Sequence, residues 1–230
     1  MPNVLADPEK EFEEELQVFD NDVDELVQCF YIWRTVHTKA RASRKIFNLL
    51  NRHAGFWVVA LGSIQANSVI ALGRIFDRGP RSHNIERLIK LAEKNKAIFS
   101  KEAVRQRKTK NPANTSDLLD HYMKNVRDPT PSDFKWLQSF VNRRRKLYER
   151  GYKQIRHKWY AHKDRTNISG FVAQTNVQEL GRLLTDLCNL HGVLWHWYRN
   201  GLNPRASRLR GTAGVQIRRD TREFLNSLIS

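Results

Sequence analysis

Apolar positions recur at helical spacing along most of the chain. In residues of about 8–40 they recur every three or four positions, which places them on one face of a long helix. These positions are Leu16, Phe19, Val23, Leu26, Val27, Phe30 and Trp33. Residues of about 44–77 predict a second long helix. Because that helix is apolar on several sides, we expect it to lie centrally. It should end near DRGP at 77–80, where Gly79 and Pro80 break a helix.

Further helices are predicted beyond this break, at about 83–98, 116–126, 133–161 and 176–199. Their predicted caps are Asn84 for the first, Ser132 or Asp133 for the third, and Thr175 or Asn176 for the last. The segment 101–116 is polar and basic and is predicted to be a loop, and 163–175 a turn-rich connector. DPTPSD at 128–133 is typical of a helix start.

No segment of the chain favours a β-strand. We therefore expect an all-α fold, an antiparallel bundle of four to five long helices. The predicted bundle covers 8–200, and 201–230 is predicted to be a basic C-terminal extension, partly mobile, with a final helix that ends in FLNSLI.

Charge is distributed unevenly along this basic chain. The formal net charge is +16, but residues 1–25 hold ten acids and one base, a net of −9, so the remainder carries 16 − (−9) = +25. Such a body indicates a polyanionic partner such as RNA, although excess charge can also serve solubility. The segment NRRRK is predicted to lie on the exposed side of its helix, where Arg143, Arg144, Arg145 and Lys146 could bind nucleic acid.

Motifs of several common enzyme classes are absent from the sequence. It contains no glycine-rich phosphate loop, no HExxH and no GxSxG. Cys29 and Cys188 lie far apart, and the acidic run Asp22, Asp24 and Glu25 is interpreted as solvated. We therefore expect no metal and no cofactor.

Features of secretion and membrane insertion are also absent. The N-terminus does not resemble a signal peptide. Uninterrupted apolar runs such as 56–62 are far shorter than the roughly 20 residues that span a bilayer. We therefore expect a soluble cytoplasmic protein that does not interact with a membrane.

The stretch IRHKWYAHKD at 155–164 concentrates the candidate chemistry. A histidine titrates near neutral pH and can transfer a proton, whereas an arginine is permanently charged and can hold a phosphate. On an ideal helix, Arg156 and His162 would point about 120° apart, so a shared phosphate requires fraying near Ala161 or a shared site. The alternative interpretation is that both are polar residues at a helix C-terminus.

Two stretches resemble the HEPN superfamily of helical ribonucleases, and more narrowly its AbiU2-like branch. One is R-x-K-x-x-A-H-x-D, formed by Arg156, Lys158, Ala161, His162 and Asp164, and the other is NSVIALGRIFD at 67–77. The resemblance extends over about residues 10–200. Many members of the superfamily carry Asn or Asp after the motif arginine, where this chain has His157.

The resemblance implies a metal-independent endoribonuclease that serves phage defence or a toxin–antitoxin system. Attack by the RNA 2′-hydroxyl would leave a 2′,3′-cyclic phosphate, with proton transfer by His162 and phosphate binding by Arg156, in the cleft of a homodimer. Supporting roles are predicted for His157, Lys158, Asp164, Arg74 and Asp77, and RNA contact for Lys163. An intrahelical ion pair is the other interpretation of Arg74 and Asp77.

Two other functions stay open from the sequence. One is a catalytically inactive helical module that binds nucleic acid or protein through the same basic surface. The other is a toxin–antitoxin component that is neutralised by an antitoxin or another defence protein.

Overall fold

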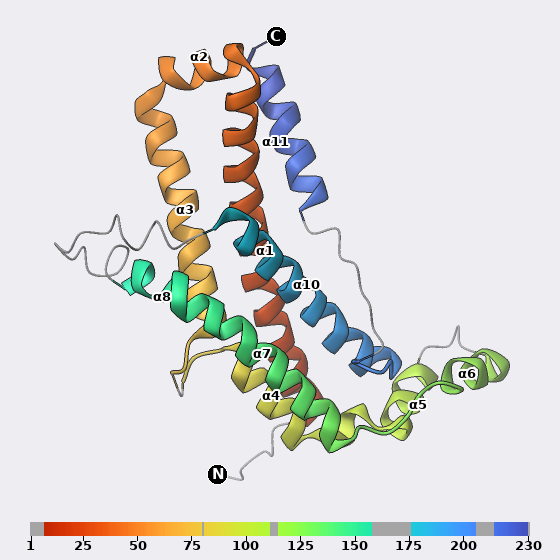
Figure 1. Ribbon diagram of the computed structural model, residues 1–230. Coiled ribbons are helices and arrows are strands. Elements are labelled where there is room, and N and C mark those ends of the chain that lie inside the picture. Colours follow the sequence, from red (N-terminus) through yellow and green to blue (C-terminus); the bar gives the residue numbers. More distant parts are fainter. Residues whose placement is uncertain (1–6, 80, 111–114, 158–175, 206–213, 230) are drawn as a thin grey trace, which may run out of the picture. The chain divides into compact units, whose positions relative to one another are not determined.

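The computed structural model describes residues 7–79, 81–110, 115–157, 176–205 and 214–229. These residues form helices and no strands, which confirms the all-α prediction (Figure 1). The longer helices are α1 (Pro8–Ala42), α3 (Ala54–Phe76), α7 (Pro131–Gly151), α10 (Val177–Asn200) and α11 (Val215–Ser227). The shorter ones are α2 (Arg44–Arg52), α4 (Ile85–Lys94), the 3₁₀ helix η1 (Lys96–Phe99), α5 (Lys101–Thr109), α6 (Ser116–Met123) and α8 (Lys153–Ile155).

The chain divides into two compact units. The first unit consists of Met1–Asp20, Phe76–Lys146 and Asp186–Gly211, and the second of Asn21–Ile75, Leu147–Thr185 and Thr212–Ser230. Each unit has a core of its own. The predicted division of the chain at residue 200 stays a prediction.

Buried aromatic rings form the core of the first unit. Phe99 of η1 lies with its ring centroid 5.0 Å from that of Phe12 on α1 and 4.5 Å from that of Trp197 on α10. Near the other end of this part of α1, Asp20 pairs with His191, whose Nδ1 is 3.1 Å from the Asp20 Oδ1. The two helices are therefore antiparallel here, as the bundle prediction requires.

The predicted loop at 101–116 is wrong, because α5 occupies the whole of its first half. The Ser100 side chain accepts a hydrogen bond from the Ala103 N–H at 3.2 Å and caps the helix. Arg107 makes this basic segment part of the core: its Nη2 donates to the carbonyls of Ile98 and Tyr198 at 2.7 and 2.6 Å. Val104 of α5 is also buried and adds an apolar contact that holds the helix in place.

The start of α7 also differs from the prediction. The helix begins at Pro131, a position where the missing N–H costs nothing. Asp133 is not its N-cap but its third residue, and its carboxylate accepts hydrogen bonds from the Thr130 N–H and hydroxyl at 2.9 and 2.7 Å. Arg127 donates to both carboxylate oxygens at 2.8 Å. This network fixes the entry into the helix that leads to IRHKWYAHKD.

The predicted helix at 44–77 is two helices in the second unit, because the chain turns at His53 between α2 and α3. The Ser43 side chain caps α2 by accepting a hydrogen bond from the Ile46 N–H at 3.4 Å. The turn lets Ile46 of α2 and Leu61 of α3 reach the same apolar cluster, which also contains Val36 of α1. Figure 1 shows α2 as the corner between α1 and α3.

The prediction that the second long helix lies centrally holds only for its last part. Leu72 and Ile75 are buried, but Phe56, Val58 and Val59 are 67%, 72% and 68% exposed. Helix α3 therefore has an apolar face near its N-terminus that no other described residue covers.

Among the described residues, α3 is also the one helix long and apolar enough, by length and composition, to cross a membrane. Helix α3 contains the run at 56–62 and the apolar residues that follow it. A search for uninterrupted apolar runs does not detect such a helix, because polar residues divide it. One such helix does not by itself establish a span, and the structure is compatible with a soluble protein.

The C-terminal segment contains the predicted final helix, α11. Leu225 is fully buried in the cluster with Val36 and Ile46, so this helix belongs to the core of the second unit. Gly214 precedes it with a φ of 72°, and a Cβ there would overlap the Tyr31 ring. Glycine is therefore the residue that allows α11 to begin against α1.

Candidate functional site

The helix that leads into IRHKWYAHKD is interrupted before the motif arginine. The predicted helix at 133–161 is wrong as one continuous element: α7 ends at Gly151, Tyr152 forms a turn, and α8 follows. Arg156 and His157 then lie in a π-helical turn. Such turns are rare, and they occur frequently at functional sites.

Arg156 lies against α3 at Gly73, and both residues belong to the second unit. A Cβ at position 73 would fall 2.9 Å from the Arg156 Cζ and closer still to its Cδ and Nε. The half-buried guanidinium therefore crosses the helix where a glycine removes the side chain. Gly73 of the stretch 67–77 and the motif arginine are thus direct neighbours in the second unit.

No carboxylate among the described residues forms an ion pair with Arg156. The nearby Arg74 is different, since its Nε lies 2.7 Å from Asp22 Oδ1 and its Nη2 lies 2.5 Å from Glu25 Oε2. Two acids of α1 thus pair with Arg74, whereas none of the described acids pairs with Arg156. An arginine held in this way suits a phosphate, whose oxygens match the planar guanidinium.

The ion pairs of Arg74 correct two sequence-based interpretations. Arg74 pairs with α1 and not with Asp77, so the predicted intrahelical pair is wrong. Asp22 and Glu25 are not simply solvated, since the Asp22 side chain is 14% exposed. Burial alone would lower the pKa of Arg74, but the hydrogen bonds and charges of Asp22 and Glu25 outweigh burial and raise it.

Asp77 has a structural contact of its own in the first unit. Its Oδ1 accepts hydrogen bonds from the backbone N–H of Arg78 at 2.7 Å and of Gly79 at 3.3 Å. These bonds stabilise the turn after α3. The supporting catalytic role that the resemblance implied for Asp77 stays a prediction.

Two contacts join the end of α7 and α8 to the start of α10. The Arg150 Nη2 lies 2.5 Å from Glu179 Oε1, and the Tyr152 hydroxyl donates to the Asn176 carbonyl at 3.5 Å. Asn176 is the N-cap, as predicted: its Oδ1 accepts from the Gln178 and Glu179 N–H groups at 2.8 and 3.2 Å. Burial, reinforced by the charge of Glu179, raises the pKa of Tyr152 to about 12, so this phenol stays neutral.

The segment NRRRK is not one exposed face. Arg143 and Lys146 are exposed, but Arg145 is buried, with 4% of its surface accessible. Arg144 donates from Nε to Asp186 Oδ2 at 2.9 Å, and its guanidinium stacks on the Phe140 ring at 3.7 Å. The predicted exposure is thus wrong for Arg145, and Arg144 is committed to contacts within the first unit. Binding of nucleic acid by these residues stays a prediction.

Several predicted site residues lie outside the described residues. These are Lys158, His162, Lys163 and Asp164. His157 is described, and it is exposed. Within the described part of the chain, no group of three or more His, Cys, Asp or Glu side chains could hold a metal ion.

Sequence reasoning missed the residues that hold the site together. Gly73 was part of the quoted stretch, but its role depends on Arg156, far away along the chain. Asp22 and Glu25 are three residues apart, a spacing that puts both carboxylates on one helix face. Together with Arg74, an arginine in the mostly apolar helix α3, this spacing was the sequence signal that could have predicted the two ion pairs.

One comparison with known proteins identifies a family for this chain. A family model for AbiU2, within HEPN, matches residues 9–224, a span that includes Gly73, Arg156 and the whole IRHKWYAHKD stretch. No curated protein and no solved structure gives a significant match. The chain therefore belongs to the AbiU2 family of the HEPN superfamily.

Proposed function

We propose that this protein is a metal-independent endoribonuclease whose site is built around Arg156 and His162. The observation that carries the proposal is the placement of Arg156 over Gly73, with no carboxylate partner among the described residues. Membership of a HEPN family supports a role of this type. The net charge of +16 supports an RNA substrate.

In the proposed reaction, the RNA 2′-hydroxyl attacks the adjacent phosphorus. His162 takes the 2′-hydroxyl proton, the bond from phosphorus to the 5′-oxygen breaks, and the leaving oxygen takes a proton from water. The products are a 2′,3′-cyclic phosphate and a free 5′-hydroxyl. Arg156 stabilises the negative charge that develops on the phosphorane oxygens. Histidine suits its task because its unperturbed pKa lies near ~6.5.

The proposed active form is a homodimer in which two motifs form one cleft. The exposed apolar face of α3, formed by Phe56, Val58 and Val59, supports a protein–protein contact in the second unit. Exposed Arg143 and Lys146 are proposed to contact RNA phosphates. We place this activity in the cytoplasm, in phage defence or a toxin–antitoxin system, with an antitoxin or another defence protein as a further partner.

A cleavage assay in EDTA tests this function. Purified protein is incubated with labelled tRNA and mRNA, and the product ends are analysed. The wild type should leave cyclic phosphates, and His162→Ala and Arg156→Ala should each lower the rate at least about 100-fold. His121→Ala is the matched control, since His121 is exposed on α6 in the first unit.

The second candidate function is a binding module without catalysis. Its basis is the basic surface together with His157, which replaces the Asn or Asp of many members. A folded wild type that binds RNA but cuts none of the substrates would establish this alternative and refute the ribonuclease. Arg143→Ala would then weaken RNA binding and reduce its salt dependence.

A further inference from the structure

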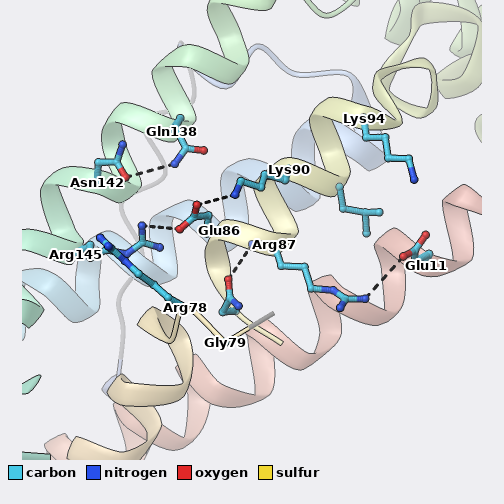
Figure 2. A pocket seen from close by; sticks show the side chains of 12 residues that line it. Glu11, Arg78, Gly79, Glu86, Arg87, Lys90, Lys94, Gln138, Asn142 and Arg145 are labelled. Atoms are coloured by element: carbon cyan, nitrogen blue, oxygen red, sulfur yellow. Dashed lines mark hydrogen bonds and ion pairs between the residues drawn. The ribbon is translucent and has the colours of Figure 1, made fainter. Parts of the chain in front are cut away.

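The first unit contains a basic pocket that the ribonuclease proposal does not use. It has a volume of about 750 Å³ and lies between α1, the turn after α3, α4 and α7 (Figure 2). This volume is in the range of small-ligand sites. Its charged lining residues are Glu11, Arg78, Glu86, Arg87, Lys90, Lys94 and Arg145. The five cations outnumber the two acids.

Arg145 is the residue that points to a ligand. It is 4% exposed, and its Nη1 lies 2.7 Å from Glu86 Oε2, the contact drawn in Figure 2. Its Nε and Nη2 are buried and have no hydrogen-bond partner among the described residues. Buried donors are nearly always paired, because an unpaired one loses its hydration without compensation. Two such donors on a pocket-lining side chain therefore indicate a bound acceptor.

The geometry of these donors indicates the kind of acceptor. Nε and Nη2 form one edge of the guanidinium, and their N–H groups point in nearly the same direction. This edge binds two oxygens of a carboxylate or a phosphate at once. Glu86 occupies the Nη1 position and leaves the paired edge without a partner among the described residues.

The surrounding charges favour an acceptor with more than one negative charge. Lys90 hydrogen-bonds to Glu86, and with the nearby Arg145 it lowers the pKa of that carboxyl. The ionised Glu86 offsets one cation. Buried Glu15 pairs with the Arg87 Nε at 2.7 Å, and Glu11 lies 3.9 Å from the Arg87 Nη2. With Glu15 counted beside the two acids of the lining, two positive charges remain in excess around the pocket.

The uncharged lining residues make base recognition unfavourable. No aromatic ring lines the pocket, so a nucleobase would find no stacking surface. Apart from Leu91, the uncharged lining consists of Gly79 and the amides Asn84, Gln138 and Asn142. We propose that this pocket binds phosphate groups without regard to a base, with Nε and Nη2 of Arg145 holding one phosphate and Lys90 facing a second.

Titration calorimetry with inorganic pyrophosphate at low salt tests this proposal. The wild type should bind it, and Arg145→Gln should weaken binding at least about 10-fold, since a hydrogen bond to a charged group is lost. Lys135→Ala is the control: it removes one positive charge from an exposed position of α7 that does not line the pocket. It should change the affinity less than about twofold. Absence of binding by the wild type, or equal binding by Arg145→Gln, would refute the site.

A second variant covers the case in which Arg145→Gln does not fold. The Lys90 side chain is 68% exposed, so Lys90→Ala should keep the thermal unfolding midpoint and still weaken pyrophosphate binding several-fold. Unchanged affinity in Lys90→Ala would also contradict the proposal. No RNA cleavage is measured, so the result is independent of the ribonuclease proposal.

Competition identifies the source of the phosphate groups. A short single-stranded RNA that displaces pyrophosphate in an Arg145-dependent way would assign the pocket to backbone phosphates. Failure of that RNA to compete would assign it to a small phosphorylated molecule. Either outcome follows only if the pocket binds phosphate through Arg145.

Discussion

The Arg156 guanidinium lies across the backbone of α3 at Gly73, where a Cβ would be 2.9 Å from the Arg156 Cζ. This contact joins two stretches that are far apart in the sequence. One stretch supplies the charge, and the other supplies the groove in which the arginine lies. Position 73 should therefore control the site without being part of its chemistry.

Gly73→Ala should separate cleavage from stability. The new methyl group would meet the end of a flexible arginine side chain, which can move away at little cost. Alanine is also the better helix former by about 1 kcal/mol, so the free energy of unfolding should stay the same or rise by up to about 1 kcal/mol. Cleavage should fall about 10-fold or more, because Arg156 loses its position. RNA cleavage and urea unfolding of the same preparation measure the two effects.

Gly62→Ala is the control for this experiment. Gly62 lies on the same helix, and a Cβ there would have no atom within 4 Å. We expect a gain in stability of about 0.5–1 kcal/mol and unchanged cleavage. If Gly73→Ala cleaved RNA as fast as Gly62→Ala, the contact with Arg156 would not matter for activity.

The two ion pairs of Arg74 should contribute different amounts to the stability of the second unit. Asp22 is 14% and Glu25 41% exposed, so solvent screens the second pair more strongly. Asp22→Asn should cost about 1 kcal/mol of unfolding free energy and Glu25→Gln less than about 0.5 kcal/mol. Denaturant unfolding at low and high salt measures both, and Glu14→Gln, at an exposed position of α1, should be close to neutral. Equal losses at Asp22 and Glu25 would contradict this account.

Arg107→Lys should destabilise the protein even though the charge is kept. The Arg107 guanidinium binds two backbone carbonyls, pairs with Glu9 at 2.5 Å and stacks on Tyr198 at 4.1 Å. A lysine cannot reproduce this planar arrangement, and the side chain is 8% exposed. We expect a loss of about 3 kcal/mol, measured by thermal or urea unfolding. Arg105→Lys, on the exposed side of the same helix, should change the stability little.

Arg107 also illustrates what the sequence could not predict. KEAVRQRKT is polar and basic, so its pattern favours a loop. Its helix is stabilised by contacts with Glu9 and Tyr198, far away in the chain, and by the Ser100 cap. Long-range contacts of this kind override local propensity. The long apolar periodicity of α1 and α10, by contrast, predicted those helices closely because most of their periodic apolar residues are buried.

The candidate site was predictable to a similar extent. Two stretches in this order identified the family: 67–77, followed by the motif that contains Arg156 and His162. The support of Arg156 by Gly73 was not predictable, since it requires knowing which helix turn the arginine crosses. The buried position of Arg145 was missed for a related reason, because a run of arginines has the composition of a solvated face.

Asp133→Asn should show how the stability depends on pH. The Arg127 guanidinium and the two Thr130 donors outweigh burial and lower the pKa of Asp133 from 3.8 to about 2. Because the folded pKa lies below the unfolded one, this stabilisation is complete above about pH 5 and is lost as the pH falls from about 4 to 2. The shift corresponds to about 2 kcal/mol. In urea unfolding, the unfolding free energies of the wild type and the variant should differ by this amount at pH 7 and by much less near pH 2. A difference that stayed constant across this range would show that packing, and not the charge of Asp133, stabilises the start of α7.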